Sequence, residues 1–542
     1  AELGCRAHFG LLKRLPRLDR NYDSSELANS NLLKYRMRNN VQKMEQFGEF
    51  LAKHQINSSI LRFGPTHSEK DGKENDQQTV DKGNGLFAAN DLNIQSESKA
   101  VVTIPGSALL NAPAVTALAS SNPRLRRCLD VLFDLGAVNE RRLLISVLLF
   151  AKQLSSSKVE SGEQYSESAY NWAKYARILP TLDGLNLPVL FNNIEFDCLV
   201  GTGVDIATVA KRRKLQAEYS TLIPAFKHID FTFENDPTKD GELPGIDFNN
   251  FVWADAIFWS RVISFASANS AASTNEEPDL HMVPLLDFAN HSETPEMNWV
   301  LSETLPRSIT LNIISELPIQ RNSELHISYG NKPNSELLFI HGFAIPNNPH
   351  DSVSFPTPII DDDSDVAQSK MDLILRLDLP VNIQLQTSLA FETANIESAT
   401  RLQIALKESG SEIISMPSLL SLLIAVIDPT DFIFDSITSI AQLESELSQD
   451  PLVNVFLLRT FTVLLDVVQE RLEQLVNSDD IVDAAEKGGE SVKAQRLQFM
   501  RVVRRGHYNI LENAWNVIGL LQENFLALDD VSQYLKQMAG TS

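Results

Sequence analysis

The polar and aromatic residues that could do chemistry gather in two segments about forty residues apart, 284–292 and 324–343. Together the segments carry Asp287, Asn290, His291, Tyr329, His341 and Phe343. Taken singly, an asparagine or a histidine is more often a structural polar residue whose hydrogen bonds are satisfied within the protein. A tyrosine in the sequence Ile-Ser-Tyr-Gly is likewise typical of a core residue at the end of a strand. The functional hypothesis therefore depends on the pair of segments and not on one residue.

A metal site is not predicted. No third cysteine, histidine or carboxylate accompanies His281 and His291 at a spacing typical of metal ligands. The three cysteines, Cys5, Cys128 and Cys198, are widely scattered. This excludes a disulfide framework and a CxxC-type zinc site, and it fits a reducing compartment.

Two further stretches could hold a small ligand. Gly83 and Gly85 permit positive φ and a close approach of the backbone to a ligand, although an ordinary hairpin turn is the alternative. Arg261 lies among aromatic and aliphatic residues, where a lone arginine is typical of a surface group with a buried stem. It could also form a charge-assisted pair with a carboxylate. The glycine turn as a whole, residues 82–88, also contains Asn84 and Leu86.

In order and spacing, these motifs resemble the SET-domain protein-lysine methyltransferases of the Rubisco large-subunit methyltransferase type. The resemblance implies an α+β fold, in which a SET domain of short β-strands with a helical insertion precedes an all-α substrate-binding domain. It implies S-adenosylmethionine as the cofactor and a protein side chain as the methyl acceptor. Further matches extend it over roughly residues 35–530: Trp172, Tyr175, Leu179, Pro180, Lys214, Glu218, Tyr219, Asn334, Arg505, Gly506 and His507.

The resemblance also implies roles for single residues. Tyr329 would be the catalytic residue, because its phenol would help to orient the methyl group and the incoming nitrogen. Arg261 would pair with the cofactor carboxylate, and Asp287 would contribute near the lysine channel, chiefly through backbone carbonyls. The cofactor-binding residues would be Gly83, Asn84, Gly85, Leu86, Arg261, Asn290, His291, Tyr329 and Phe343. The substrate-binding residues would be Arg261, Asp287 and His341.

Methyl transfer to lysine needs no metal, because its main chemical requirement is that the attacking lysine amine be neutral. A free lysine has a pKa of about 10.4, so roughly one in 2,500 is neutral at pH 7, equivalent to about 4.6 kcal/mol. A channel that excludes water and holds a sulfonium cation nearby lowers that pKa. Backbone carbonyls and a tyrosine oxygen can then align the amine with the methyl group.

His341 departs from the family pattern, which usually ends Leu-Leu-x-x-Tyr-Gly-Phe. Here the sequence is Leu-Leu-Phe-Ile-His-Gly-Phe. Histidine keeps a ring and a polar tip but is shorter than tyrosine, and it can titrate near neutrality. We expect the substitution to affect the number of methyl groups added or the type of target side chain.

Composition narrows the choice of partners. The net charge of −23 and the pI of about 4.9 disfavour nucleic acid and favour a basic protein partner, although an acidic surface can simply confer solubility. No run of about eighteen apolar residues indicates a membrane span. We expect a monomeric protein of the cytoplasm or nucleus.

At 542 residues the chain should hold two to four domains. We expect an N-terminal extension (1–34), a SET domain (35–345) with a helical insertion at about 165–250, and a helical substrate-binding domain (366–542). Strands are expected at 297–300, 309–314 and 325–329, and helices through most of 124–155, 170–265 and 370–542. Polar runs at 66–82, 155–168 and 361–365 are predicted to be loops.

The leading hypothesis is a protein-lysine methyltransferase whose target is a ribosomal protein. Cytochrome c lysine methylation and protein-histidine methylation are alternatives within the same class. A rival from another class is an inactive SET-like scaffold that binds a partner through its helical half. His341 favours the scaffold, whereas intact Tyr329, Asn290, His291 and Arg261 favour the enzyme. The substrate, the methyl count and the true N-terminus are not determined by the sequence.

Overall fold

The structure is a computed structural model. It describes residues 42–66, 83–92, 100–156, 165–231, 246–265, 279–302, 307–359, 364–386, 413–434, 436–487 and 492–540. The predicted N-terminal extension, Lys82, and most of the polar runs at 66–82, 155–168 and 361–365 lie outside these residues. The boundaries of the predicted domains therefore stay predictions.

Short antiparallel strands form the part of the fold that holds the two motif segments. One sheet has the order β1-β2-β8, with β1 at Leu61–Pro65, β2 at Asn84–Ala88 and β8 at Glu324–Leu325. A second has the order β3-β7-β6, with β3 at Ala100–Ile104, β7 at Ile309–Ile313 and β6 at Met297–Leu301. A hairpin joins β4 at Val262–Ser264 to β5 at Leu280–Met282.

The predicted strands at 297–300 and 309–314 are confirmed, whereas the one predicted at 325–329 is shorter. Alternate residues of β7 are buried, as expected for a strand with one face on the core. Strand β8 ends at Leu325, and Ile327 then forms a single parallel bridge with His291. The chain leaves the sheet here because it crosses the first motif segment.

Most helices of this part follow the first strands, and several of them fall within the range predicted for the insertion. A helix over residues 42–53 comes first. It is followed by α2 (Ala112–Ser120), α3 (Pro123–Asp134), α4 (Glu140–Ser156), α5 (Glu167–Ile178), α6 (Asn193–Asp197), α7 (Val204–Phe226) and α8 (Phe248–Arg261). Short 3-10 helices lie at Gly106–Ala108, Leu182–Gly184, Pro188–Leu190, Lys227–Ile229 and Leu286–Phe288. After β8 come α10 (Asn334–Glu336) and the π-helical turn η6 (Leu337–His341).

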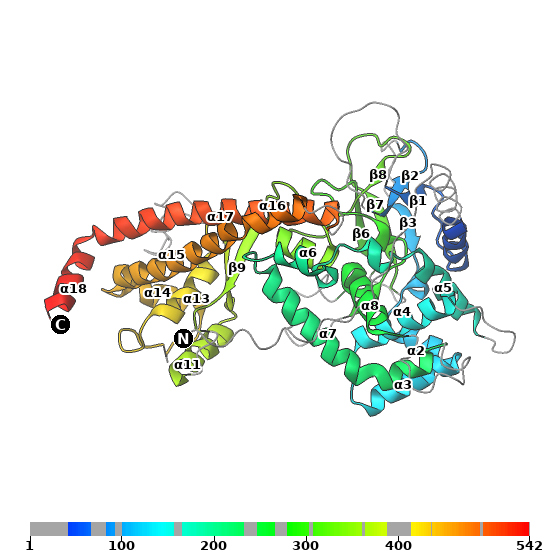
Figure 1. Cartoon of the computed structure of the whole chain (residues 1–542), viewed down its shortest axis with the longest axis horizontal. Coiled ribbons are helices and arrows are strands. Elements are labelled where there is room, and N and C mark those ends of the chain that lie inside the picture. Colours follow the sequence, from blue (N-terminus) through cyan, green and yellow to red (C-terminus); the bar gives the residue numbers. More distant parts are fainter. Residues whose placement is uncertain are drawn as a thin grey trace.

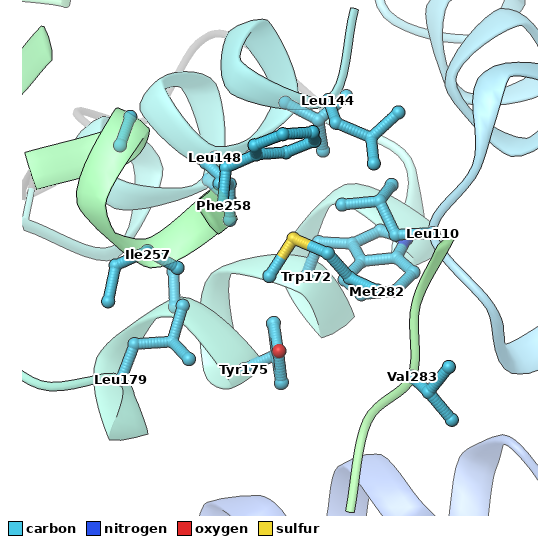
Figure 2. Packing of buried hydrophobic residues seen from close by; sticks show 14 of the residues in the cluster. Leu110, Leu144, Leu148, Trp172, Tyr175, Leu179, Ile257, Phe258, Met282 and Val283 are labelled. Atoms are coloured by element: carbon cyan, nitrogen blue, oxygen red, sulfur yellow. The ribbon is translucent and has the colours of Figure 1, made fainter. Parts of the chain in front are cut away.

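The core of this part lies where α4, α5 and α8 meet. Trp172 and Tyr175 of α5 pack there among leucines of α4 and Phe258 of α8 (Figure 2). Every residue of α8 from Phe251 to Phe258 is buried, so Arg261 at its last turn is held on a rigid element. The same packing positions Tyr175, whose hydroxyl donates a hydrogen bond to Asp287 of the first motif segment.

The C-terminal part is mainly helical and has its own hydrophobic core. Its helices are α11 (Asp365–Arg376), α13 (Met416–Val426), α14 (Ile440–Gln449), α15 (Val453–Asn477), α16 (Asp479–Lys487), α17 (Ala494–Leu526) and α18 (Asp529–Gly540). A two-stranded sheet pairs β9 (Ser352–Pro356) with β10 (Asn382–Gln386). Together with the strands described above, this composition confirms the α+β class.

Strand β10 lies inside the stretch expected to be helical. Its residues Ile383 and Leu385 are buried and alternate with more exposed neighbours, which is the period of a strand. The helical pattern of the surrounding sequence is much longer. A strand pattern of only five residues could not be distinguished within it.

Helix α17 joins the two parts of the molecule. It extends from the C-terminal helices toward the strands and α6 (Figure 1). A third apolar cluster contains residues from the insertion, from η6 and from α17. Within the described residues, no single helix has the length and apolar character to span a membrane, although the bent pair Ile440–Gln449 and Val453–Lys487 passes that test together.

Candidate active site

The glycine turn places its backbone against two polar side chains. Gly83 has φ of +81°, which favours glycine, and Gly85 follows it within β2. A Cβ atom on Gly85 would lie 2.7 Å from Oε1 of Glu324 and 3.1 Å from Nδ2 of Asn290. Glycine is therefore required at position 85 for these two side chains to reach the strand. We call Gly85, Asn290 and Glu324 the cradle.

Asn84 and Leu86 complete the same strand. The carbonyl oxygen of Asn84 accepts a hydrogen bond of 3.4 Å from Nδ2 of Asn290. The side chain of Leu86 is fully buried in the core, so only its backbone could contact a ligand. Pairing of β2 with β8 brings this turn next to the second motif segment, about 240 residues later.

The two motif segments cross each other at Asn290 and His291. The Ile327 amide donates to the Asn290 carbonyl oxygen at 3.0 Å, and the Ser292 amide donates to the Ile327 carbonyl oxygen at 3.1 Å. The Tyr329 amide donates to Nδ1 of His291 at 3.0 Å. Because Nδ1 is an acceptor here, the proton of a neutral His291 is on Nε2. Burial lowers the pKa of His291 and favours that neutral form.

Tyr329 lies where the segments cross, and its hydroxyl is fixed. The phenol donates a hydrogen bond of 2.8 Å to the carbonyl oxygen of Ala289. Burial raises the pKa of Tyr329 to about 12, although the charge of Arg261 opposes this. The phenol is therefore neutral at physiological pH, and its oxygen keeps lone pairs that can accept a hydrogen bond.

Arg261, Asp287 and Tyr175 form a buried polar cluster. Nη1 of Arg261 donates to the carbonyl oxygen of Asp287 and lies 3.6 Å from its Oδ2. The Tyr175 hydroxyl donates to the same Oδ2. Burial raises the pKa of Asp287 to about 6, although Arg261 and Tyr175 oppose the shift. Within the described structure, Nε of Arg261 and Oδ1 of Asp287 are buried and have no hydrogen-bond partner.

His341 is at the end of η6 and faces Tyr329. The two ring centroids are 4.8 Å apart, and Phe343 lies about 6 Å from both rings. Burial, followed by the charge of Lys332, lowers the pKa of His341 to about 4, against a backbone hydrogen bond with Ser260. The imidazole is therefore neutral. Its Nδ1 is buried and finds no partner among the residues described.

The structure thus brings the predicted residues into one region. Gly85 contacts Asn290, the adjacent His291 contacts Tyr329, and Tyr329 contacts His341. Gly83 lies at the edge of this region, with open space where a side chain would be. The roles of these residues in binding and catalysis stay predictions. The part of the chain that is described contains no group of three or more His, Cys, Asp or Glu side chains suited to a metal ion.

Two residues were not assigned to the site from the sequence. Tyr175 matched only the helical insertion, yet its hydroxyl reaches Asp287, 112 positions later. Glu324 opens the second motif segment, and its carboxylate accepts the Asn290 amide at 2.7 Å. For Glu324, the available sequence signal was its position as a carboxylate directly before the strand predicted at 325–329. No local signal pointed to Tyr175.

Comparisons with known proteins agree with this geometry. Ribosomal lysine N-methyltransferase set10 of Schizosaccharomyces pombe is 26% identical over 188 residues, which are 35% of this chain and 30% of that protein. N-lysine methyltransferase setd6 of Danio rerio is 26% identical over 282 residues, which are 49% of this chain and 51% of that protein. The chain therefore spans between about a third and half of these relatives. No family model matches the sequence.

Solved structures match over nearly the whole chain. The SET domain of LSMT bound to lysine and AdoHcy has a TM-score of 0.59 at 16% identity, and covers 90% of this chain and 93% of that one. Rubisco LSMT bound to AdoMet has a TM-score of 0.57 at 17% identity, and covers 90% and 94%. Fold and sequence agree with the motif resemblance: the chain shares the fold of Rubisco LSMT and is similar in sequence to lysine N-methyltransferases.

Proposed function

We propose that this protein is an S-adenosylmethionine-dependent protein-lysine N-methyltransferase that acts on a non-histone protein. The observation that carries the proposal is the position of Tyr329. Its neutral phenol is fixed where the two motif segments cross and faces the predicted substrate residue His341. The names of the sequence relatives, all lysine methyltransferases, support the same reaction.

The unpaired atoms of the site suit the amino-acid end of S-adenosylmethionine. Nε of Arg261 is a buried donor and Oδ1 of Asp287 is a buried acceptor, and each lacks a partner in the described residues. A ligand with both a carboxylate and an ammonium group would satisfy both atoms. The bare face of Gly85 allows a ligand to approach the backbone of β2. When bound, the cofactor would supply an electrophilic methyl group on a sulfonium.

The protein's own residues would prepare the acceptor nitrogen. A lysine side chain that enters this buried region loses water, which lowers its pKa and favours the neutral amine. The Tyr329 hydroxyl donates its hydrogen bond to the Ala289 carbonyl oxygen, so its own oxygen is left to accept an N–H of the amine. Because the phenol is neutral, Tyr329 would act by orienting the amine and not as a base.

A ribosomal protein is the substrate we propose. Two relatives, from Schizosaccharomyces pombe and Saccharomyces cerevisiae, are named ribosomal lysine N-methyltransferases. Ribosomal proteins are basic, and the net charge of −23 would speed their encounter with this chain. Such a target would place the enzyme in the cytoplasm or nucleus.

Labelling of a ribosomal-protein extract tests the proposal. Wild-type protein, Tyr329→Phe and Tyr170→Phe would each be incubated with the extract and S-adenosylmethionine carrying a labelled methyl group. Tyr170 is an exposed residue of α5 outside the site, and serves as the matched control. We expect Tyr170→Phe to label like wild type and Tyr329→Phe to label about 100-fold more slowly, because an orienting hydroxyl is lost.

Two results would contradict the proposal in different ways. Equal labelling by wild type and Tyr329→Phe would remove Tyr329 from catalysis. No labelling by wild type, together with no cofactor binding by calorimetry, would favour an inactive scaffold, the reading that His341 supports. Mass spectrometry of the labelled band would identify the target protein and residue.

A further inference from the structure

Three titratable side chains, Glu296, His326 and Glu324, contact one another in that order and end at the cradle. Nδ1 of His326 is 3.0 Å from Oε2 of Glu296, and Nε2 of His326 is 3.4 Å from Oε2 of Glu324. The other carboxylate oxygen of Glu324 accepts the Asn290 amide at 2.7 Å. His326 thus lies between two carboxylates, one of which belongs to the cradle.

This geometry determines the protonation state of His326. An ionised carboxylate can only accept hydrogen bonds, so each ring nitrogen that faces one must carry a proton. Neutral imidazole has a single N–H and cannot satisfy both neighbours. The imidazolium form is therefore the one that fits. Burial alone would lower the pKa of His326, but Glu324 and Glu296 outweigh it and raise that pKa.

Glu296 makes the shorter contact with the His326 ring, at 3.0 Å against 3.4 Å for Glu324. Oε2 of Glu296 also accepts the backbone amide of His326 at 2.9 Å, and the Met297 amide donates to the His326 carbonyl oxygen at 3.0 Å. When His326 loses one proton, the remaining N–H should therefore stay with Glu296. Nε2 would then present a lone pair to Glu324 and repel its carboxylate.

Glu324 in turn controls the cradle. Its Oε1 lies against the bare face of Gly85, and it orients the Asn290 amide that also reaches the Asn84 carbonyl oxygen. Among the described residues, two more titratable groups lie nearby: His291, which feels the charge of His326, and Glu293, whose Oε1 is 3.7 Å from Nε2 of His291. Neither lies between His326 and Glu324.

We propose that Glu324 and His326 are positioning residues for the cofactor: protonated His326 holds the Glu324 carboxylate, which holds the Asn290 amide in the cradle. The inference rests on the proposed function, because it assigns the cradle to S-adenosylmethionine. Its consequence is that cofactor affinity follows the charge of His326. Affinity is complete below the raised pKa of this histidine and falls as the pH increases through it.

Calorimetric titration of the full chain tests this inference. The probe is S-adenosylhomocysteine, which has the same amino-acid and adenosine groups, between about pH 6 and pH 9. We expect the wild-type affinity to fall about tenfold as the pH increases over this range. A change of this size corresponds to the loss of one charge-assisted hydrogen bond. His326→Gln and Glu324→Gln should bind about tenfold more weakly at low pH and vary little with pH.

Two further variants separate positioning from folding. His326→Lys keeps a positive charge that does not titrate in this range, so it should retain affinity and lose the pH dependence. Glu296→Gln removes one carboxylate from His326 and should move the midpoint to lower pH. His228→Gln, in the 3-10 helix Lys227–Ile229, is the matched control and should behave like wild type.

The calorimetric results can contradict the roles of His326 and Glu324 separately. A wild-type affinity that is independent of pH, or the same pH dependence in His326→Lys as in wild type, would overturn the role of His326. Wild-type affinity in Glu324→Gln would overturn the role of Glu324. In these cases the proposed function stands, because the cofactor product still binds. No binding by wild type at any pH would overturn the proposed function and this inference with it.

Discussion

At the scale of single residues, the site combines two neutral rings that can each accept a hydrogen bond. The Tyr329 hydroxyl donates its hydrogen bond to the Ala289 carbonyl oxygen, so the phenol oxygen can only accept a further one. His341 has a buried Nδ1 that finds no partner in the described part of the chain. Because burial keeps its imidazole neutral, this nitrogen can also accept a hydrogen bond. An amine that reached the polar edges of both rings would therefore meet two acceptors, and an amine that still carries N–H groups would satisfy them best.

This geometry predicts that His341 limits the number of methyl groups added. Each methyl group removes one N–H from the amine, so a highly methylated product leaves the His341 acceptor buried and unpaired, at a cost of about 1–3 kcal/mol. His341→Phe removes the acceptor and should shift the products toward higher methylation by roughly tenfold. Mass spectrometry of the modified target measures the distribution, with His228→Phe as the control. An unchanged distribution would show that His341 does not restrict the product.

At the scale of elements, the site is the crossing of two segments beside one short sheet. Pairing of β2 with β8 carries Glu324 to the glycine turn, and the bridge between His291 and Ile327 carries Tyr329 to the first segment. Each contact is made by backbone groups, so the positions of the side chains follow from the register. The register is in turn fixed by the buried pair Leu86 and Leu325.

Gly85→Ala tests this close approach. The added methyl group would lie 2.7 Å from the Glu324 carboxylate and 3.1 Å from the Asn290 amide, which are hydrogen-bonded to each other. Neither can withdraw without breaking that bond, so we expect cofactor affinity to fall at least about tenfold. Gly48→Ala is the control, because that helical glycine has no atom within 4 Å of its added methyl group. It should be neutral or stabilising by about 0.5–1 kcal/mol.

The sequence could predict the elements with long periodic patterns but not the contacts between distant residues. The helical pattern at 453–475 predicted α15, and the paired motifs predicted that His291 and Tyr329 belong to one site. The bond from Tyr175 to Asp287 was not predictable, because nothing in either local sequence records a partner 112 positions away. The two-residue strand β8 was too short for its period to show where pairing ends.

At the scale of the whole molecule, α17 ties the helical part to the part that holds the site. Gly506 of α17 packs closely against Asp351, whose carboxylate holds Asn334 at the start of α10. Helix α10 leads directly into η6 and His341. Buried Arg504 reaches across to the insertion through the Val200 carbonyl oxygen at 2.8 Å. The helical part therefore also supports the segment that contains the site.

The ion pair between Arg496 of α17 and Glu195 of α6 is the strongest test of that connection. The pair is 2.7 Å long and almost fully buried, and Arg496 also donates to the Leu185 carbonyl oxygen. Arg496→Met would leave the buried Glu195 carboxylate without its ionic partner, so we expect the free energy of unfolding to fall by about 3–5 kcal/mol. The double variant with Glu195→Gln should recover part of this loss, because the unpaired charge is removed.

Urea denaturation followed by tryptophan fluorescence and circular dichroism would measure these changes. Arg501→Met is the matched control on the same helix, because Arg501 pairs with Glu486 at the exposed surface. Such a surface pair contributes about 0–1 kcal/mol, so this variant should unfold close to wild type. If Arg496→Met and Arg501→Met unfolded at the same urea concentration, the buried pair would not hold the two parts together. A selective loss in Arg496→Met would show that the buried pair between α17 and α6 stabilises the fold.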